Sequence, residues 1–83
     1  MNITAELSLY PLNEGFKPVI IDYIEQLHTF DGLEIRTHAL STEIFGDYET
    51  VMSAIQATTR TVFESDSGIV LAAKYLNRDR RDG

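Results

Sequence analysis

The stretch NITAELSLYPL, residues 2–12, alternates apolar and polar side chains for nine positions before a proline interrupts it. Because successive side chains of a β-strand point to opposite faces of a sheet, this pattern predicts a strand with one apolar and one polar face. The apolar set is Ile3, Ala5, Leu7 and Leu9, and the polar set is Thr4, Glu6, Ser8 and Tyr10. The polar row is too hydrophilic for a core, so we expect it to line an interface or a ligand pocket.

Two helical patterns follow this strand. Apolar residues recur every three or four positions over residues 16–30 and again over residues 48–63, which predicts two amphipathic helices. Gly32 is placed to end the first helix, because glycine tolerates the left-handed conformation common at helix ends. Asp47 is placed to cap the second helix, because its carboxylate can accept the unpaired N–H groups of the first turn.

Three more strands complete the pattern. Residues 33–40 alternate, residues 41–45 follow after a bend, and residues 69–76 form the most apolar run. A turn-forming cluster at residues 11–15 separates the first strand from the first helix. The order strand, helix, strand, strand, helix, strand predicts an α+β ferredoxin-like βαββαβ sandwich. Two helices then cover one face of a four-stranded antiparallel sheet, and the other face stays open.

The sequence predicts one domain over residues 1–77 and a short charged tail over residues 78–83, and we expect residues 77–83 to be frayed. A small core without disulfides is often reinforced by oligomerisation. An open sheet face on so small a domain is usually buried by a second subunit or by a ligand. We therefore expect a homodimer or homotetramer assembled through the sheet.

The charge balance disfavours several classes of partner. The formal net charge is −6, and three of the seven cations lie in the tail. Because binding to a phosphate backbone needs clustered Lys and Arg, we expect no nucleic-acid partner. No apolar run approaches the ~20 residues of a membrane span, so we expect no membrane partner. The start of the chain has no charged-then-apolar leader, so we expect a cytoplasmic protein.

Catalytic motifs are missing from the sequence. The chain has no cysteine, and the spacing of His28 and His38 matches no metal-binding motif. No two of the five glycines are close enough for a Walker loop or a dinucleotide fingerprint. We therefore expect no enzymatic activity, no bound metal and no cofactor. For His38, beside the expected bend, both a surface or interface role and a ligand contact stay open.

Two carboxylates fall in predicted strands, where a charged group must be solvated, paired or used. These are Glu6 and Glu43. One interpretation is an ion pair, with Arg36 and Lys74 as candidate partners on neighbouring strands. The other is recognition of a ligand by the carboxylates.

Four hydroxyl residues form a second set, namely Ser8, Tyr10, Thr37 and Thr42. Thr and Tyr are common in strands for reasons of packing alone. The alternative is a site in which hydroxyls, a carboxylate and a stacking ring bind a neutral or cationic heterocycle. Tyr10 and Phe45 are the candidate stacking rings.

Two segments resemble the YkoF-like small thiamine-binding proteins. Residues 5–12 resemble the strand, ending at a proline, with which these proteins begin, and residues 42–47 resemble their Thr-x-x-x-Gly element before the second helix. The resemblance extends over residues 2–76. It implies a ferredoxin-like fold, assembly through the sheets into dimers or tetramers, and non-enzymatic binding of thiamine or its hydroxymethylpyrimidine part.

The resemblance carries over Ser8 and Tyr10 from the first motif and Thr42 and Gly46 from the second. Thiamine carries a permanent cation and an aminopyrimidine, which suit carboxylates, hydroxyls and an aromatic face. Because the chain is acidic, we expect it to prefer unphosphorylated thiamine to thiamine pyrophosphate. Two other functions stay open, namely a ferredoxin-like regulatory or interaction module that senses another small molecule, and a small cofactorless dimeric enzyme.

Overall fold

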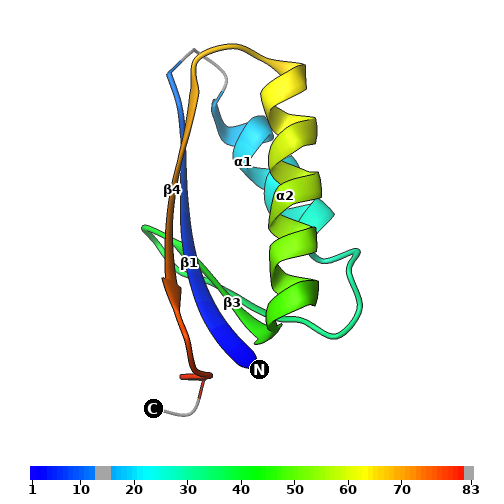
Figure 1. Ribbon diagram of the computed structural model, residues 1–83. Helices are drawn as coiled ribbons and strands as arrows, with labels where there is room; N and C mark the ends of the chain where they lie inside the picture. Colours follow the sequence, from blue (N-terminus) through cyan, green and yellow to red (C-terminus); the bar gives the residue numbers. More distant parts are fainter. Residues whose placement is uncertain (13–15, 82–83) are drawn as a thin grey trace.

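The computed structural model describes residues 1–12 and 16–81 (Figure 1). The elements are β1 (Asn2–Pro11), α1 (Phe16–Leu27), β2 (Glu34–Thr37), β3 (Thr42–Asp47), α2 (Tyr48–Ser65) and β4 (Ile69–Leu76). The strands form one antiparallel sheet in the order β2-β3-β1-β4. Both helices lie on the same side of this sheet (Figure 1). The predicted ferredoxin-like α+β fold is confirmed. In the described part of the chain, neither helix has the length and apolar character needed to cross a membrane.

The core lies between the sheet and the two helices. Ile3, Ala5 and Leu7 are buried, as the alternation of the first strand predicts. Ala5 pairs with Ile44 of β3, and neither residue is exposed to solvent. The helices add a buried layer from Tyr23, Leu27, Val51, Ala54, Ile55 and Val62. Burial of this apolar surface is what holds the helices on the sheet.

Element ends differ in part from the sequence pattern. The carboxylate of Asp47 accepts the N–H of Glu49 at 3.1 Å, so the predicted cap of α2 is confirmed. α1 ends at Leu27, before the end of its apolar pattern, and the chain reaches β2 through Gly32 at a φ of +83°. β2 is shorter than expected, because the chain turns back at residues 38–41. Of the turn predicted at residues 11–15, Pro11 belongs to β1, and residues 13–15 lie outside the described residues.

Gly46 marks a close approach between β3 and the loop that follows α1. A Cβ atom added to Gly46 would lie 2.8 Å from Cδ2 of Leu33 and 3.0 Å from the carbonyl oxygen of Gly32. The first distance is shorter than real Cβ contacts and the second is tighter than most of them, so a side chain at this position would require Leu33 and the loop to shift. The glycine of the Thr-x-x-x-Gly element therefore has a packing role here.

The tail is folded against the open face of the sheet, so the expectation of a frayed end is wrong for residues 78–81. The hydroxyl of Thr4 donates to the carbonyl of Arg78 and accepts the N–H of Arg80, both at 2.9 Å. Arg36 donates to the carbonyl of Arg81 at 2.7 Å. These contacts are non-local, since Thr4 and Arg36 are 45 to 76 residues away from their partners in sequence.

Phe45 is the apolar centre of this tail contact. Its ring lies on the open face, opposite Thr4 and Glu34 in the strand register, yet it is only 1% exposed. The guanidinium groups of Arg36 and Arg81 lie 5.1 and 5.7 Å from the ring centroid. Cations over an aromatic face are attracted by its quadrupole. One end of the open face is therefore closed by the protein's own tail.

Candidate functional site

A cavity of about 230 Å³ opens where β1 runs past the end of β3. β3 pairs with β1 only as far as Leu7 and Thr42, whereas β1 continues to Pro11 alongside β4 alone. Residues of α1 and of the turn 38–41 border the space that this mismatch in strand length leaves. The cavity is thus a consequence of one strand being longer than its neighbour.

The cavity combines an apolar lining with several polar groups. Its apolar residues are Leu7, Leu9, Ile20, Ile24, Ala39 and Leu40, and its polar residues are Ser8, Tyr10, Tyr23, Thr37, His38, Ser41 and Thr42. Drug-sized ligands usually occupy pockets of ~300–1,000 Å³ with this kind of mixed lining. A cavity of about 230 Å³ is smaller than this range, so it suits a single heterocyclic ring with its substituent outside.

The backbone of Leu9 faces this cavity. The N–H of Tyr48 donates to the carbonyl of Met1, and the N–H of Leu12 donates to the carbonyl of Gly68, both at 2.8 Å. The first bond continues the pairing of β1 with β3 by one residue pair, and the second continues the pairing of β1 with β4. Because hydrogen-bonded pairs alternate along antiparallel strands, odd residues of β1 direct their N–H and C=O toward β3. Within the described residues, β3 begins opposite Leu7 and has no strand residue opposite Leu9.

Hydroxyl groups surround this unpaired strand edge. The hydroxyl of Ser8 donates to the carbonyl of Leu40 at 3.1 Å and so ties β1 to the turn. Thr37 and Thr42 pair across β2 and β3 on the helix side of the sheet, with their hydroxyl oxygens 3.5 Å apart. Thr42 is only 6% exposed, so its hydroxyl is held in a protected position.

Tyr23 of α1 is a fixed wall of the cavity. Its hydroxyl and that of Thr59 on α2 are hydrogen-bonded at 3.0 Å. Burial raises the pKa of Tyr23, while the hydrogen bond with Thr59 lowers it in part. The net effect is a raised pKa, so the phenol stays neutral around pH 7. The hydrogen bond engages the hydroxyl with α2, which leaves the ring as the surface that Tyr23 presents to a ligand.

Glu6 and Glu43 lie opposite each other on the open face and contact the turn beside the cavity. Ser41 donates to Glu6 at 3.3 Å, and Nε2 of His38 lies 2.6 Å from Oε1 of Glu43. The expected partners lie opposite these carboxylates in the register, Lys74 opposite Glu6 and Arg36 opposite Glu43, but Arg36 forms its ion pair with Glu34 at 2.5 Å. No ion pair within 4 Å joins Glu6 to Lys74 in the described residues. The two carboxylates give this side of the turn a negative charge.

One known protein family matches nearly the whole chain. The profile of the family described as thiamine-binding proteins matches residues 5–82. The chain belongs to the thiamine-binding protein family. No curated protein matches the chain. The resemblance that the sequence motifs indicate is therefore confirmed over nearly the whole chain.

Solved structures share the fold of this thiamine-binding family member. A protein from Methanocaldococcus jannascii is 25% identical, with a TM-score of 0.80, and the match covers 98% of this chain and 84% of that one. A candidate thiamine biosynthesis or salvage protein from Thermotoga maritima is 19% identical, with a TM-score of 0.81 and coverage of 94% and 85%. A protein from Streptococcus pneumoniae is 17% identical, with a TM-score of 0.87 and coverage of 95% and 89%.

The six site residues expected from the sequence separate into two groups in this family member. The cavity brings together the four hydroxyl residues, Ser8, Tyr10, Thr37 and Thr42. Glu6 and Glu43 are not in its lining and lie on the open face next to the turn. The stacking role considered for Phe45 is wrong for the free protein, because the tail covers this ring.

Sequence reasoning missed the α1 wall and the strand edge. Ile20, Tyr23 and Ile24 belong to the apolar stripe of α1, which indicates a core and gives no signal of a cavity. The role of Leu9 depends on its backbone N–H and C=O groups, and a pattern of side chains gives no information about them. The difference in length between the first and third expected strands was the available signal. The described residues contain no cluster of three or more His, Asp or Glu that could hold a metal ion.

Proposed function

We propose that the protein binds thiamine or its hydroxymethylpyrimidine part in the cavity beside Leu9, without transforming it, and acts as a cytoplasmic homo-oligomer. One observation carries this proposal. In a member of the thiamine-binding family, the cavity brings to one place an unpaired strand edge and the four hydroxyl residues expected from the sequence. A small ring with several hydrogen-bonding atoms fits such a place better than an extended or purely apolar ligand does.

The strand edge matches the aminopyrimidine of thiamine. This ring presents a nitrogen acceptor next to an exocyclic amine, which is a donor. Leu9 offers an N–H donor and a C=O acceptor on the same edge of β1, as a strand offers them to a neighbouring strand. Buried polar groups are expensive to leave unpaired, so the gain on binding includes satisfying this edge. The hydroxyls of Ser8 and Thr42 are the additional partners.

The charges near the turn favour a cation over an anion. The cavity holds one ring, so the thiazolium of thiamine extends beyond it in this proposal. Glu6 and Glu43 contact the turn that forms one wall, and opposite charges attract over the few ångströms involved. A pyrophosphate group would meet these carboxylates, so we expect thiamine pyrophosphate to bind more weakly than thiamine.

Calorimetric titration tests this proposal. Thiamine, hydroxymethylpyrimidine and thiamine pyrophosphate are titrated in parallel into the purified protein. We expect saturable binding of the first two with a stoichiometry near one per chain, because the cavity lies within one chain, and weaker binding of the third. Absence of binding for all three at several temperatures would overturn the proposal and favour the regulatory-module or enzyme alternatives. Tighter binding of the pyrophosphate would overturn the charge argument alone.

A further inference from the structure

The two edge strands of the sheet differ in how well they are protected. β2 has four residues, and two of them, Glu34 and Arg36, are charged and paired with each other. β4 has eight residues, Ile69–Leu76, of which Lys74 alone is charged. Natural edges are usually protected by shortness, charges, proline or bulges, because unpaired backbone groups invite pairing with another chain. β2 shows such protection, and β4 shows little of it.

The backbone groups that β4 presents outward follow from the register. Leu12 donates to Gly68, so even residues of β1 bond to β4, and their partners are Val70, Ala72, Lys74 and Leu76. Because the pattern alternates, the intervening residues direct their N–H and C=O groups away from β1. These outward residues are Leu71, Ala73 and Tyr75. They present a regular hydrogen-bonding ladder along the free edge.

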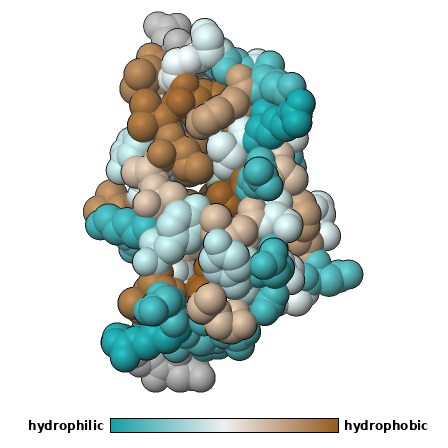
Figure 2. Space-filling model, viewed as in Figure 1, coloured by the Kyte–Doolittle hydropathy of each residue, from teal (hydrophilic) through white to brown (hydrophobic). Residues whose placement is uncertain are grey.

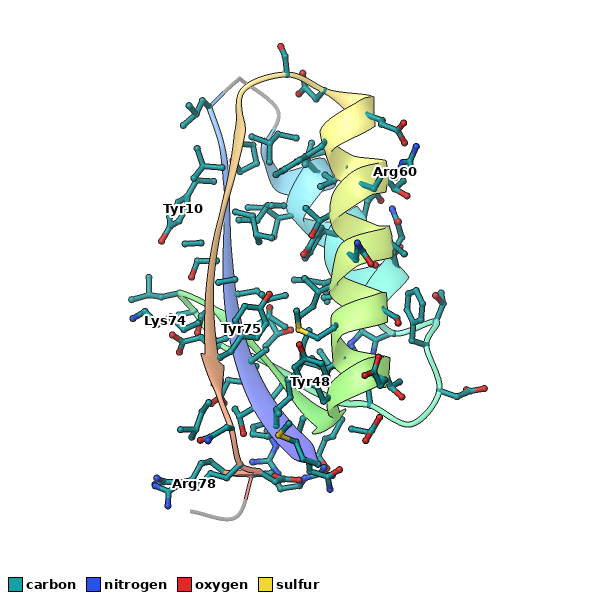
Figure 3. The ribbon with its side chains drawn as sticks, viewed as in Figure 1. Tyr10, Tyr48, Arg60, Lys74, Tyr75 and Arg78 are labelled. Atoms are coloured by element: carbon teal, nitrogen blue, oxygen red, sulfur yellow. The ribbon has the colours of Figure 1, made fainter. Side chains whose placement is uncertain are left out.

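An apolar groove runs beside the same edge, between β4 and α2. It measures about 630 Å³, and its apolar residues are Met52, Ile55, Phe63, Leu71 and Tyr75. Phe63 is 49% and Tyr75 50% exposed, although both are large apolar side chains. Tyr75 extends from the strand toward α2, whereas Lys74 leaves on the opposite side (Figure 3). Figure 2 shows apolar atoms gathered over the upper part of this face, above a more polar lower part.

We propose that β4 pairs antiparallel with β4 of a second copy, about a twofold axis that passes through Ala73. This inference rests on the homo-oligomer of the proposed function and names its interface. The pairing joins two four-stranded sheets into one of eight strands, and each α2 closes the groove beside the other. On the helix side, Leu71 of one copy lies opposite Tyr75 of the second copy. Twofold symmetry makes such an interface self-complementary.

Charge favours this edge and disfavours the neighbouring register with its axis at Lys74. Two chains with a net charge of −6 repel each other unless they meet where carboxylates are absent. β4 has no carboxylate, so the paired strands bring none together, and Glu64, which lines the groove, lies 3.8 Å from Arg60 of the same helix. With the axis at Ala73, Lys74 lies opposite Ala72 of the second copy. An axis at Lys74 would place two lysines directly opposite, which is destabilising in a strand pair.

Cysteine crosslinking tests the register, and the chain has no native cysteine to interfere. We expect Ala73→Cys to form a disulfide-linked dimer under mild oxidation, because the two Ala73 residues are direct partners. Ala72→Cys should crosslink far less. Ala72 lies opposite Lys74 of the second copy, so the two Ala72 residues are offset by two positions along the strands. Ser53→Cys, on the exposed surface of α2, is the control for random collision. Efficient crosslinking by Ala72→Cys without Ala73→Cys would overturn the register.

A proline pair tests the edge itself by light scattering. Ala73→Pro removes an outward N–H and leaves the ladder to β1 intact, which edge strands tolerate. We expect a folded monomer at concentrations where the unaltered protein is a dimer. Ala72→Pro, which removes a bond to β1, should instead lower the melting temperature. A monomeric unaltered protein, or a dimer that survives Ala73→Pro, would overturn the proposal. Thiamine titration of Ala73→Pro tests the ligand proposal separately from the dimer proposal. The cavity lies on the other side of β1, so a monomeric variant should still bind thiamine.

Discussion

The two ends of β1 are built in opposite ways. At the Thr4 end, β1 is paired on both sides, and the tail crosses its polar face and covers Phe45. At the Leu9 end, β3 has ended, and a cavity takes its place. Thr4 has its hydroxyl satisfied twice by the tail, whereas Leu9 has an unpaired strand edge. One continuous strand thus contributes stability at one end and a binding edge at the other.

The two ends of β1 differ in how their polar groups are satisfied. Buried donors and acceptors are normally paired, and each exception calls for an explanation. At the Thr4 end the tail supplies the partners. At the Leu9 end we propose that the ligand supplies them. Changes at the first end should therefore alter folding and spare binding, and changes at the second should do the reverse.

The largest effect is expected from Phe45→Ala. The ring is 1% exposed, and its removal leaves a cavity under the tail, which costs about 3–5 kcal/mol of unfolding free energy. Chemical denaturation measures this loss, with the exposed Tyr10→Ala as the matched aromatic control. Thiamine affinity measured on the folded fraction should stay unchanged. A loss of affinity as large as the loss of stability would show that the two ends are not independent.

A smaller loss of stability is expected from Thr4→Val. The substitution keeps the shape of the side chain and removes its hydrogen bonds with Arg78 and Arg80, each worth about 1 kcal/mol. We expect about 2 kcal/mol less unfolding free energy and faster amide exchange at Arg80. Thr37→Val serves as the control, because among the described residues its hydroxyl makes one hydrogen bond, which is long at 3.5 Å. An unchanged exchange rate at Arg80 would show that the tail is held by other contacts.

At the open end, Ser8→Ala and Thr42→Val should weaken thiamine binding about tenfold each, which is about 1.4 kcal/mol. Both hydroxyls line the cavity, and their loss removes partners for the ligand. Calorimetry measures the affinity, and the melting temperature should fall less than in Thr4→Val, because Ser8 donates one hydrogen bond, to Leu40, whereas Thr4 makes two with the tail. Ser53→Ala on the surface of α2 is the control. Unchanged affinity with a large drop in melting temperature would make these hydroxyls structural instead.

The smallest effect is a pH dependence of the closed end. The side chain of Arg81 hydrogen-bonds to Asp79 at 2.9 and 3.0 Å and lowers the pKa of this carboxyl below its ordinary value of about 3.9. A group with a lowered pKa stabilises the folded state above its ordinary pKa and loses this contribution as pH falls through the lowered value. We expect the protection of the tail amides, measured relative to their intrinsic exchange rates at each pH, to decrease as pH falls below about 4. In Asp79→Asn this dependence should be absent.

The order of elements follows from local patterns, which is why the sequence predicts it. Periods of two and of 3.6 residues give the strands and helices, and the cap at Asp47 marks the start of α2. The hydroxyls of Ser8 and Thr42 were predicted as one set, and the fold brings both to the cavity. The contact between Thr4 and the tail spans more than 70 residues, and no local pattern encodes it.

The strand register also lay beyond the sequence patterns. Thr42 faces the helices because it lies opposite Leu7, whereas Glu43, the next residue, lies opposite Glu6 on the open face. A register one residue different would exchange these two faces. The unpaired edge at Leu9 depends on this register and on where β3 begins, so it becomes visible only in the folded chain.

Amide chemical shifts recorded by NMR during titration with hydroxymethylpyrimidine test the central claim most directly, because they report on each backbone N–H separately. Our account predicts that the largest shifts occur at Leu9 and at the turn 38–41, and that exchange of the Leu9 amide slows on binding. Residues around Thr4 and Phe45 should stay unchanged. Shifts concentrated at that closed end or along β4 and α2, with the Leu9 amide unaffected, would contradict the account.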